Sequence, residues 1–120
     1  MACKSCYTAH IEITLAKAKD PPASIYGNID VGNTSSDHVF QKTCNMPIDV
    51  GPGETLALAL AKVGADNTAF NVYENLLNAR DFSIVSHGTA SFTPKEGTQS
   101  TTVRGGTGEL IVSVTFTKNY

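Results

Sequence analysis

The sequence predicts an all-β protein, an antiparallel β-sandwich of about eight to nine short strands, with a partly closed β-barrel as the alternative. Two observations carry this prediction. Short segments in which apolar and polar residues alternate recur along the chain, and this period of two is typical of strands with one buried face. Turns rich in glycine, proline and asparagine separate the segments. A chain of 120 residues fits a single domain, residues 1–120, with one core.

The longest apolar run, within residues 50–63, is interpreted as the central strand. Leucines at positions 56, 58 and 60 alternate with alanines at 57, 59 and 61, which favours a strand even though both residues are good helix formers. Gly51-Pro52-Gly53 forms the turn that leads into the run, with its glycines at positive φ. Because both faces are apolar, we expect both to be covered, and we expect Leu58→Asp to abolish folding.

The remaining strands follow from the same alternation, and four features qualify them. Gly27 indicates a bulge or a close backbone approach. The Leu76-Leu77 doublet indicates a bulge or strand end that turns both leucines inward, or a single helical turn. Gly88 is expected to bend a long strand that serves both sheets, and residues 1–8 are expected to be a loose terminal segment. The expected strands cover residues 10–17, 24–31, 38–43, 46–50, 70–77, 82–93, 98–103 and 109–117.

Charge and hydropathy exclude several classes of function. The net charge of −2 gives no electrostatic basis for binding nucleic acid or an anionic membrane. No apolar stretch approaches the roughly 20 residues of a transmembrane helix, and the first residues lack the apolar core of a signal peptide. We therefore expect a cytoplasmic protein without a transmembrane segment. In that compartment the Asn33-Thr34-Ser35 sequon is a polar loop.

Three cysteines leave their chemistry open. Cys3 and Cys6 could form half of a zinc site completed by Cys44, His10 or His38, but a second pair of ligands is missing. A terminal disulfide and ordinary surface thiols are the other interpretations. We expect no metal and no cofactor.

The histidines give no convincing catalytic group. Ser86-His87 and Asp37-His38 suggest parts of a triad, but neighbours along a strand point to opposite faces, so Ser86 and His87 cannot face each other. We expect no enzymatic activity.

Residues 104–108 (Arg-Gly-Gly-Thr-Gly) resemble a phosphate-binding loop only in glycine content. The lysine and the following helix of such a loop are missing, so a hairpin loop with positive φ angles is the favoured interpretation.

The remaining functional signal is a set of amides, short carboxylates and tyrosines. Sugar-binding sites use planar polar groups for hydroxyl pairs and aromatic rings for C–H faces. We therefore predict ligand binding, with a glycan as the candidate ligand, at Tyr26, Asn28, Asp30, Asp66, Asn67, Asn71, Tyr73 and Asn75.

Three segments carry a resemblance to a known family: Ile25-Tyr26-Gly27-Asn28-Ile29, residues 50–60, and Phe70-Asn71-Val72 with the later residues 86–92. In this order they resemble the all-β domain of uncharacterised function that is common in grasses and also occurs fused to ribosome-inactivating proteins. The resemblance implies a sandwich domain without known catalytic residues. The N-glycosidase activity of ribosome inactivation belongs to a different domain and is not implied for this chain.

Together these features predict a non-enzymatic binding module, a small lectin-like or defence-type protein that recognises a glycan or a protein surface. Open sheet edges suggest a homo-oligomer. One alternative is a toxin component or membrane-active β-protein, in which the Ser/Thr-rich residues 98–103 rearrange. The other is a structural protein-interaction domain.

Overall fold

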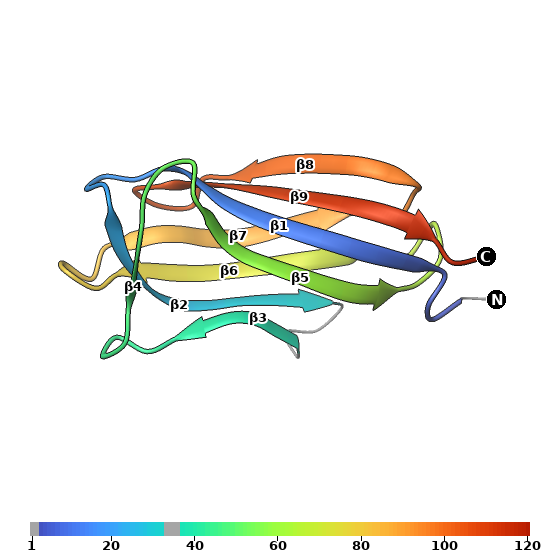
Figure 1. Ribbon diagram of the computed structural model, residues 1–120, viewed down its shortest axis with the longest axis horizontal. Helices are drawn as coiled ribbons and strands as arrows, with labels where there is room; N and C mark the ends of the chain where they lie inside the picture. The colour runs from blue at the N-terminus through green and yellow to red at the C-terminus, as the bar shows by residue number, and fades with distance from the viewer. Residues whose placement is uncertain (1–2, 33–36) are drawn as a thin grey trace.

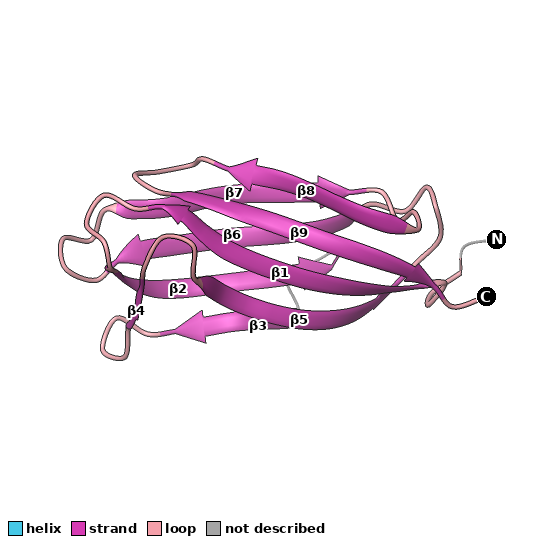
Figure 2. Cartoon of the chain, turned by 45° about the horizontal axis from the view of Figure 1, so that its top comes forward, coloured by secondary structure: helices cyan, strands magenta, loops and turns pink. Residues whose placement is uncertain are grey.

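The computed structural model describes residues 3–32 and 37–120. These residues form nine strands and no helix, arranged as two stacked antiparallel sheets (Figure 1 and Figure 2). The layered arrangement confirms the predicted sandwich, and the partly closed barrel is wrong because the strands divide into two separate sheets. The molecule is elongated along the strands, with extents of 48 × 23 × 18 Å.

One sheet has four strands and the other five. The four-stranded sheet has the order β5-β1-β9-β8, and the five-stranded sheet has the order β3-β2-β6-β7 with β4 paired to β2. The strands are β1 (Tyr7–Lys17), β2 (Ala23–Gly32), β3 (Asp37–Lys42), β4 (Ile48–Val50), β5 (Thr55–Val63), β6 (Phe70–Asn78), β7 (Ile84–Phe92), β8 (Gly97–Val103) and β9 (Glu109–Lys118).

The core lies between the sheets and follows the predicted alternation. On β1, Ile11, Ile13 and Leu15 are buried while Glu12 between them is exposed. On β9, Leu110, Val112, Val114 and Phe116 are buried in the same way. Each such side chain contributes roughly 1.5–3 kcal/mol when it leaves water, so the period-two pattern holds the two layers together. The loose terminal segment ends earlier than predicted, because β1 begins at Tyr7, which is buried.

The run of leucines and alanines is a strand, but it is not the central one. It forms β5, at the edge of the four-stranded sheet, and its leucines face outward: Leu58 is 69% exposed and Leu60 is 68% exposed. The cause is a register shift. Ile13 pairs with Ala57 while Thr14 pairs with Thr55, so Leu56 is an extra residue and both Leu56 and Ala57 are buried. Beyond this bulge the alanines face inward, and the expectation that Leu58→Asp abolishes folding loses its basis.

A second bulge corrects two predictions in the five-stranded sheet. Leu76 pairs with Ser86 and Leu77 with Ile84, so the extra residue is Val85 on β7. The strand β6 therefore keeps its alternation through the leucine doublet, with Leu76 buried and Leu77 half-buried. The neighbouring strand β7 pairs with β6 and stays within one sheet, so the predicted strand shared by both sheets is wrong.

Three glycines are required because other backbone lies against them. A Cβ atom on Gly27 would lie 2.0 Å from the Asn75 carbonyl oxygen on β6, which confirms the predicted close approach. In the β8–β9 loop a Cβ on Gly105 would lie 1.7 Å from the His87 carbonyl oxygen, and one on Gly106 would lie 2.2 Å from that of Ile84. The loop is the predicted hairpin, but positive φ is found at Gly27, Gly32, Gly53 and Gly97 among the described glycines, not in this loop.

Candidate functional site

Six of the eight predicted ligand-binding residues share the outer face of the five-stranded sheet. Register brings them together: Asn28 pairs with Asn75 and Asp30 pairs with Tyr73 across β2 and β6. Their neighbours Ile29, Val72 and Glu74 are buried on the opposite face, so the six side chains point away from the core. We call this set the amide face; its members are Tyr26, Asn28, Asp30, Asn71, Tyr73 and Asn75.

Asp30 is the anchored carboxylate of the amide face. It is only 3% exposed, and Asn28 Nδ2 donates to its Oδ2 at 2.5 Å. His38 on β3 contacts the other carboxylate oxygen through Nδ1, while about half of the His38 side chain remains exposed. The contact with Asp30 holds the imidazole of His38 at the edge of the amide face. Sequence reasoning treated His38 as a catalytic or metal candidate and missed this partnership, which depends on a bulge between Ile29 and Asp30.

The amides on β6 are also held in place by their neighbours. Ser91 Oγ donates to Asn71 Oδ1 at 2.6 Å, and Asn71 Nδ2 donates to Tyr73 Oη at 3.4 Å. His87 Nδ1 lies 3.5 Å from Asn75 Oδ1. These contacts order the polar groups before any ligand arrives, which lowers the entropic cost of binding.

An apolar region borders the amide face at the Tyr26 end. The rings of Tyr26 and Phe82 meet edge to face at a centroid distance of 6.4 Å and an interplanar angle of 81°. Phe82 is 64% exposed. An exposed aromatic ring therefore lies beside the ordered amides, as the predicted ligand-binding surface implies.

The other two predicted residues lie elsewhere. Asp66 and Asn67 occupy the turn between β5 and β6, and the Tyr7 hydroxyl of β1 donates to Asp66 Oδ1. This hydrogen bond raises the pKa of the Tyr7 phenol. Asp66 therefore anchors a turn to the four-stranded sheet, and Asn67 is exposed in the same turn.

No catalytic triad is assembled from the predicted pairs. Ser86 is buried while its neighbour His87 is exposed on the amide side, as strand alternation predicts. His10 lies on the other sheet, so the three histidines do not converge. The Asp37 side chain and the Asn33-Thr34-Ser35 sequon lie outside what the structure describes.

The cysteines form a terminal disulfide. Cys3 is bonded to Cys6, and Cys44 is a free, exposed thiol. Within residues 3–32 and 37–120, no three His, Cys, Asp or Glu side chains are grouped in a way that could hold a metal ion.

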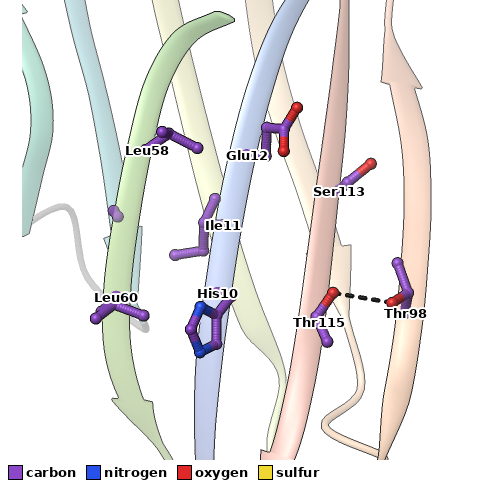
Figure 3. A pocket seen from close by; sticks show the side chains of 9 residues that line it. His10, Ile11, Glu12, Leu58, Leu60, Thr98, Ser113 and Thr115 are labelled. Atoms are coloured by element: carbon purple, nitrogen blue, oxygen red, sulfur yellow. Dashed lines mark hydrogen bonds between the residues drawn. The ribbon is translucent and has the colours of Figure 1, made fainter.

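The four-stranded sheet carries a second candidate surface that sequence reasoning missed. A shallow groove of about 680 Å³ runs over β5, β1, β9 and β8 (Figure 3). His10 and Glu12 pair with Leu60 and Leu58, so two polar groups lie beside two exposed leucines. Thr98 and Thr115 hydroxyls bond each other at 2.8 Å across the far side of the groove. We call this surface the leucine groove.

Among the described residues, two side chains on the inner face of the five-stranded sheet have buried polar atoms without a hydrogen-bond partner. Glu74 pairs with Gly88 and is 2% exposed, and neither of its carboxylate oxygens has a hydrogen-bond partner among the described residues. Burial raises the pKa of Glu74 from 4.5 to about 8. Ser86, opposite Leu76, also has an unpartnered hydroxyl in the described part of the chain. The Glu74 carboxyl group is too enclosed to contact a ligand on the amide face.

These features define a nine-stranded antiparallel β-sandwich, counted over the described residues, with an ordered polar outer face on one sheet and a leucine groove on the other. The described residues include no helix of the length and apolarity that crossing a membrane requires.

Comparison with known proteins finds likeness in structure alone. No protein-family model and no curated protein matches the sequence. The resemblance to the grass domain therefore stays a prediction. The fold is similar to a chain of a solved assembly described as "Crystal structure of Cry23Aa1 and Cry37Aa1 binary protein complex", with a TM-score of 0.55 and 11% sequence identity. The match covers 98% of this chain and 98% of that chain. At this identity the likeness shows the fold.

Proposed function

We propose that this chain is a non-enzymatic recognition module of the lectin or defence type, and that its amide face binds a glycan. The observation that carries the proposal is the convergence of six predicted residues on one ordered face. Asn28 and Asn75 offer an amide on each of two paired strands, and the buried Asp30 carboxylate holds Asn28 and His38 in place beside them. Such planar groups suit pairs of sugar hydroxyls, and the Tyr26–Phe82 pair suits a sugar ring face.

We expect the glycan to bind at the amide face and not at the other polar parts of the surface. Binding of the recombinant protein to a glycan array, competed by the free sugar, identifies the ligand. We expect Asn75→Ala to weaken binding of that sugar about tenfold, since one lost hydrogen bond costs about 1–1.5 kcal/mol. Asn67→Ala is the matched control, because it removes an exposed amide from the β5–β6 turn, and it should change the Kd by less than twofold.

Isothermal titration calorimetry of the two variants measures the difference. A silent array would count against the proposal. Equal losses in Asn75→Ala and Asn67→Ala would remove the amide face as the site.

A second candidate function is a toxin component or membrane-active β-protein. The likeness over 98% of both chains to a member of a binary Cry protein complex favours it. In this candidate the hydroxyl-rich strand β8, which carries the Ser/Thr-rich segment, leaves its place beside β9 at a membrane.

A disulfide lock tests that movement. Ser100 and Ser113 are paired, with hydroxyls 2.7 Å apart, so cysteines at both positions would join β8 to β9. We expect dye release from liposomes by the unmodified chain, loss of release in the oxidised double variant made with Cys44→Ser, and recovery on reduction. Release that persists in the oxidised form, or no release over a range of lipids and pH, would remove this candidate.

A further inference from the structure

Between its bulge at Leu56 and the charged residue Lys62, the edge strand β5 lacks the protection that natural sheet edges normally have. Edge strands usually carry charges, proline or a covering loop, because their free backbone groups otherwise pair with another chain. From Thr55 to Ala61 this strand has no charged residue, and it exposes Leu58 and Leu60 by 69% and 68%. Its bulge at Leu56 leaves a regular segment from Ala57 to Val63 that can accept a further strand.

The other edge strands differ from β5. The β8–β9 loop covers the free side of β7, where Thr107 N donates to the Ile84 carbonyl at 2.7 Å and Gly108 N to that of Val85 at 2.9 Å. On β3, His38 and Lys42 place polar groups at the edge, and β8 presents a row of hydroxyl and amide side chains. Of these edge strands, β5 is the one in which two leucines are more than two thirds exposed.

Open concave surface borders β5 on both sides. The leucine groove lies over β1 and β9. A second shallow groove of about 640 Å³ follows the free edge of β5 against β2 and β3, where it is lined by Val31, His38 and Val39. Leu58 and Leu60 line both grooves, as Figure 3 shows for the first. A strand added to this edge would have room beside the two leucines.

The positions of charge favour a second copy of this chain as the occupant. Along the middle of the outer face of β5 and β1, the charged side chains are Glu12, which pairs with Leu58, and Lys62, which pairs with Thr8. If a second β5 runs antiparallel with the two-fold axis at Leu60, Leu60 meets its own copy and Leu58 meets Lys62 of the second copy. That lysine then lies level with Glu12, about 10 Å away between Cα atoms at two strand spacings, a distance that the two extended side chains span.

We propose that two copies of this chain form a symmetric dimer through antiparallel pairing of β5 with β5. The two four-stranded sheets join into one continuous sheet. Leu58 and Leu60 of both copies form an apolar cluster, and the Glu12–Lys62 pair closes each end of it. In the single copy Lys62 Nζ donates to Thr8 Oγ1 at 2.9 Å, and it exchanges this partner for Glu12 on pairing. The dimer leaves the amide face free and does not depend on the glycan proposal.

Sedimentation equilibrium from 1 to 500 µM tests the dimer. We expect a concentration-dependent dimer in the wild type and at least a 100-fold weaker association in Leu58→Asp, with circular dichroism showing that this variant stays folded. Met46→Asp is the matched control, because Met46 is 66% exposed in the loop between β3 and β4, and it should associate like the wild type. A wild type that stays monomeric at 500 µM, or a dimer that Leu58→Asp leaves intact, would overturn the proposal.

Exchange of the charges tests the register. Glu12→Lys and Lys62→Glu should each weaken association about tenfold, because each places like charges together at both ends of the cluster. The double variant should restore association to within about twofold of the wild type. Additive weakening in the double variant would overturn the antiparallel register centred on Leu60.

Discussion

Glu74→Gln should remove a steep loss of stability that the wild-type protein shows as the pH rises from about 5 to 8. In the folded chain the Glu74 carboxyl group is 2% exposed, and desolvation raises its pKa from 4.5 to about 8. The folded state therefore keeps a proton that the unfolded chain has already released over this range. Each pH unit in that window lowers the free energy of unfolding by about 1.4 kcal/mol.

The direction follows from the proton count. Below pH 4.5 both states hold the proton, and above pH 8 both have released it, so the slope is confined between these values. From pH 5 to pH 7.5 the wild type should lose about 3 kcal/mol from this group. Glutamine has a similar shape and no titratable proton. In the Glu74→Gln variant, position 74 should therefore contribute almost no change in the free energy of unfolding over the same pH range.

Urea unfolding at closely spaced pH values measures the slope. Glu96→Gln is the control, since Glu96 is exposed in the turn between β7 and β8, and it should keep the wild-type slope. If Glu74→Gln and the wild type show parallel curves from pH 5 to 8, Glu74 does not titrate in this window.

The second large effect is expected at Gly27. Gly27→Ala should destabilise the fold by about 3 kcal/mol or more, because its methyl group would lie 2.0 Å from the Asn75 carbonyl oxygen. The contact joins the backbones of two paired strands, β2 and β6, so it cannot be relieved by a change of side-chain rotamer. The strands have to separate locally, and the hydrogen bonds that set the amide face are lost with them.

Gly97→Ala separates this clash from backbone strain. Gly97 has φ +120° and Gly27 has φ +129°, but no atom lies within 4 Å of a Cβ built on Gly97. The control should lose about 1–2 kcal/mol from the positive φ angle alone. Equal shifts of the urea midpoint in both variants would show that strain, and not the contact with Asn75, determines the loss at Gly27.

Local alternation was sufficient to predict the sandwich, and register determined where the prediction failed. Strand β9 keeps the predicted alternation from Leu110 to Phe116, because one of its faces packs in the core and the other faces solvent. The run of leucines and alanines has two apolar faces, so its pattern does not show which face is inside. The bulge at Leu56 decides that, and it depends on how β5 pairs with β1.

In the candidate site, too, strand alternation and pairing predicted some positions correctly, whereas composition alone did not. Strand parity already placed Asn71, Tyr73 and Asn75 on one side of β6, and the pairing of β2 with β6 added Asn28 and Asp30. Asp66 and Asn67 were grouped with them by composition, which carries no position in space. The leucine groove was invisible to sequence reasoning because exposed and buried leucines have the same signature in an alternating strand.

The pairing of the first and last strands affects how the protein folds. Tyr7 pairs with Lys118, and the Thr8 hydroxyl donates to Asn119 Oδ1, a residue 111 positions away. During synthesis β1 leaves the ribosome before the other eight described strands and its neighbour β9 leaves after them, so the four-stranded sheet cannot be completed until β9 is free. Contacts between such distant positions make folding slow compared with proteins of local topology. Until β9 pairs with β1, the apolar side of β1 stays partly uncovered, and the newly made chain is most prone to aggregation during this interval.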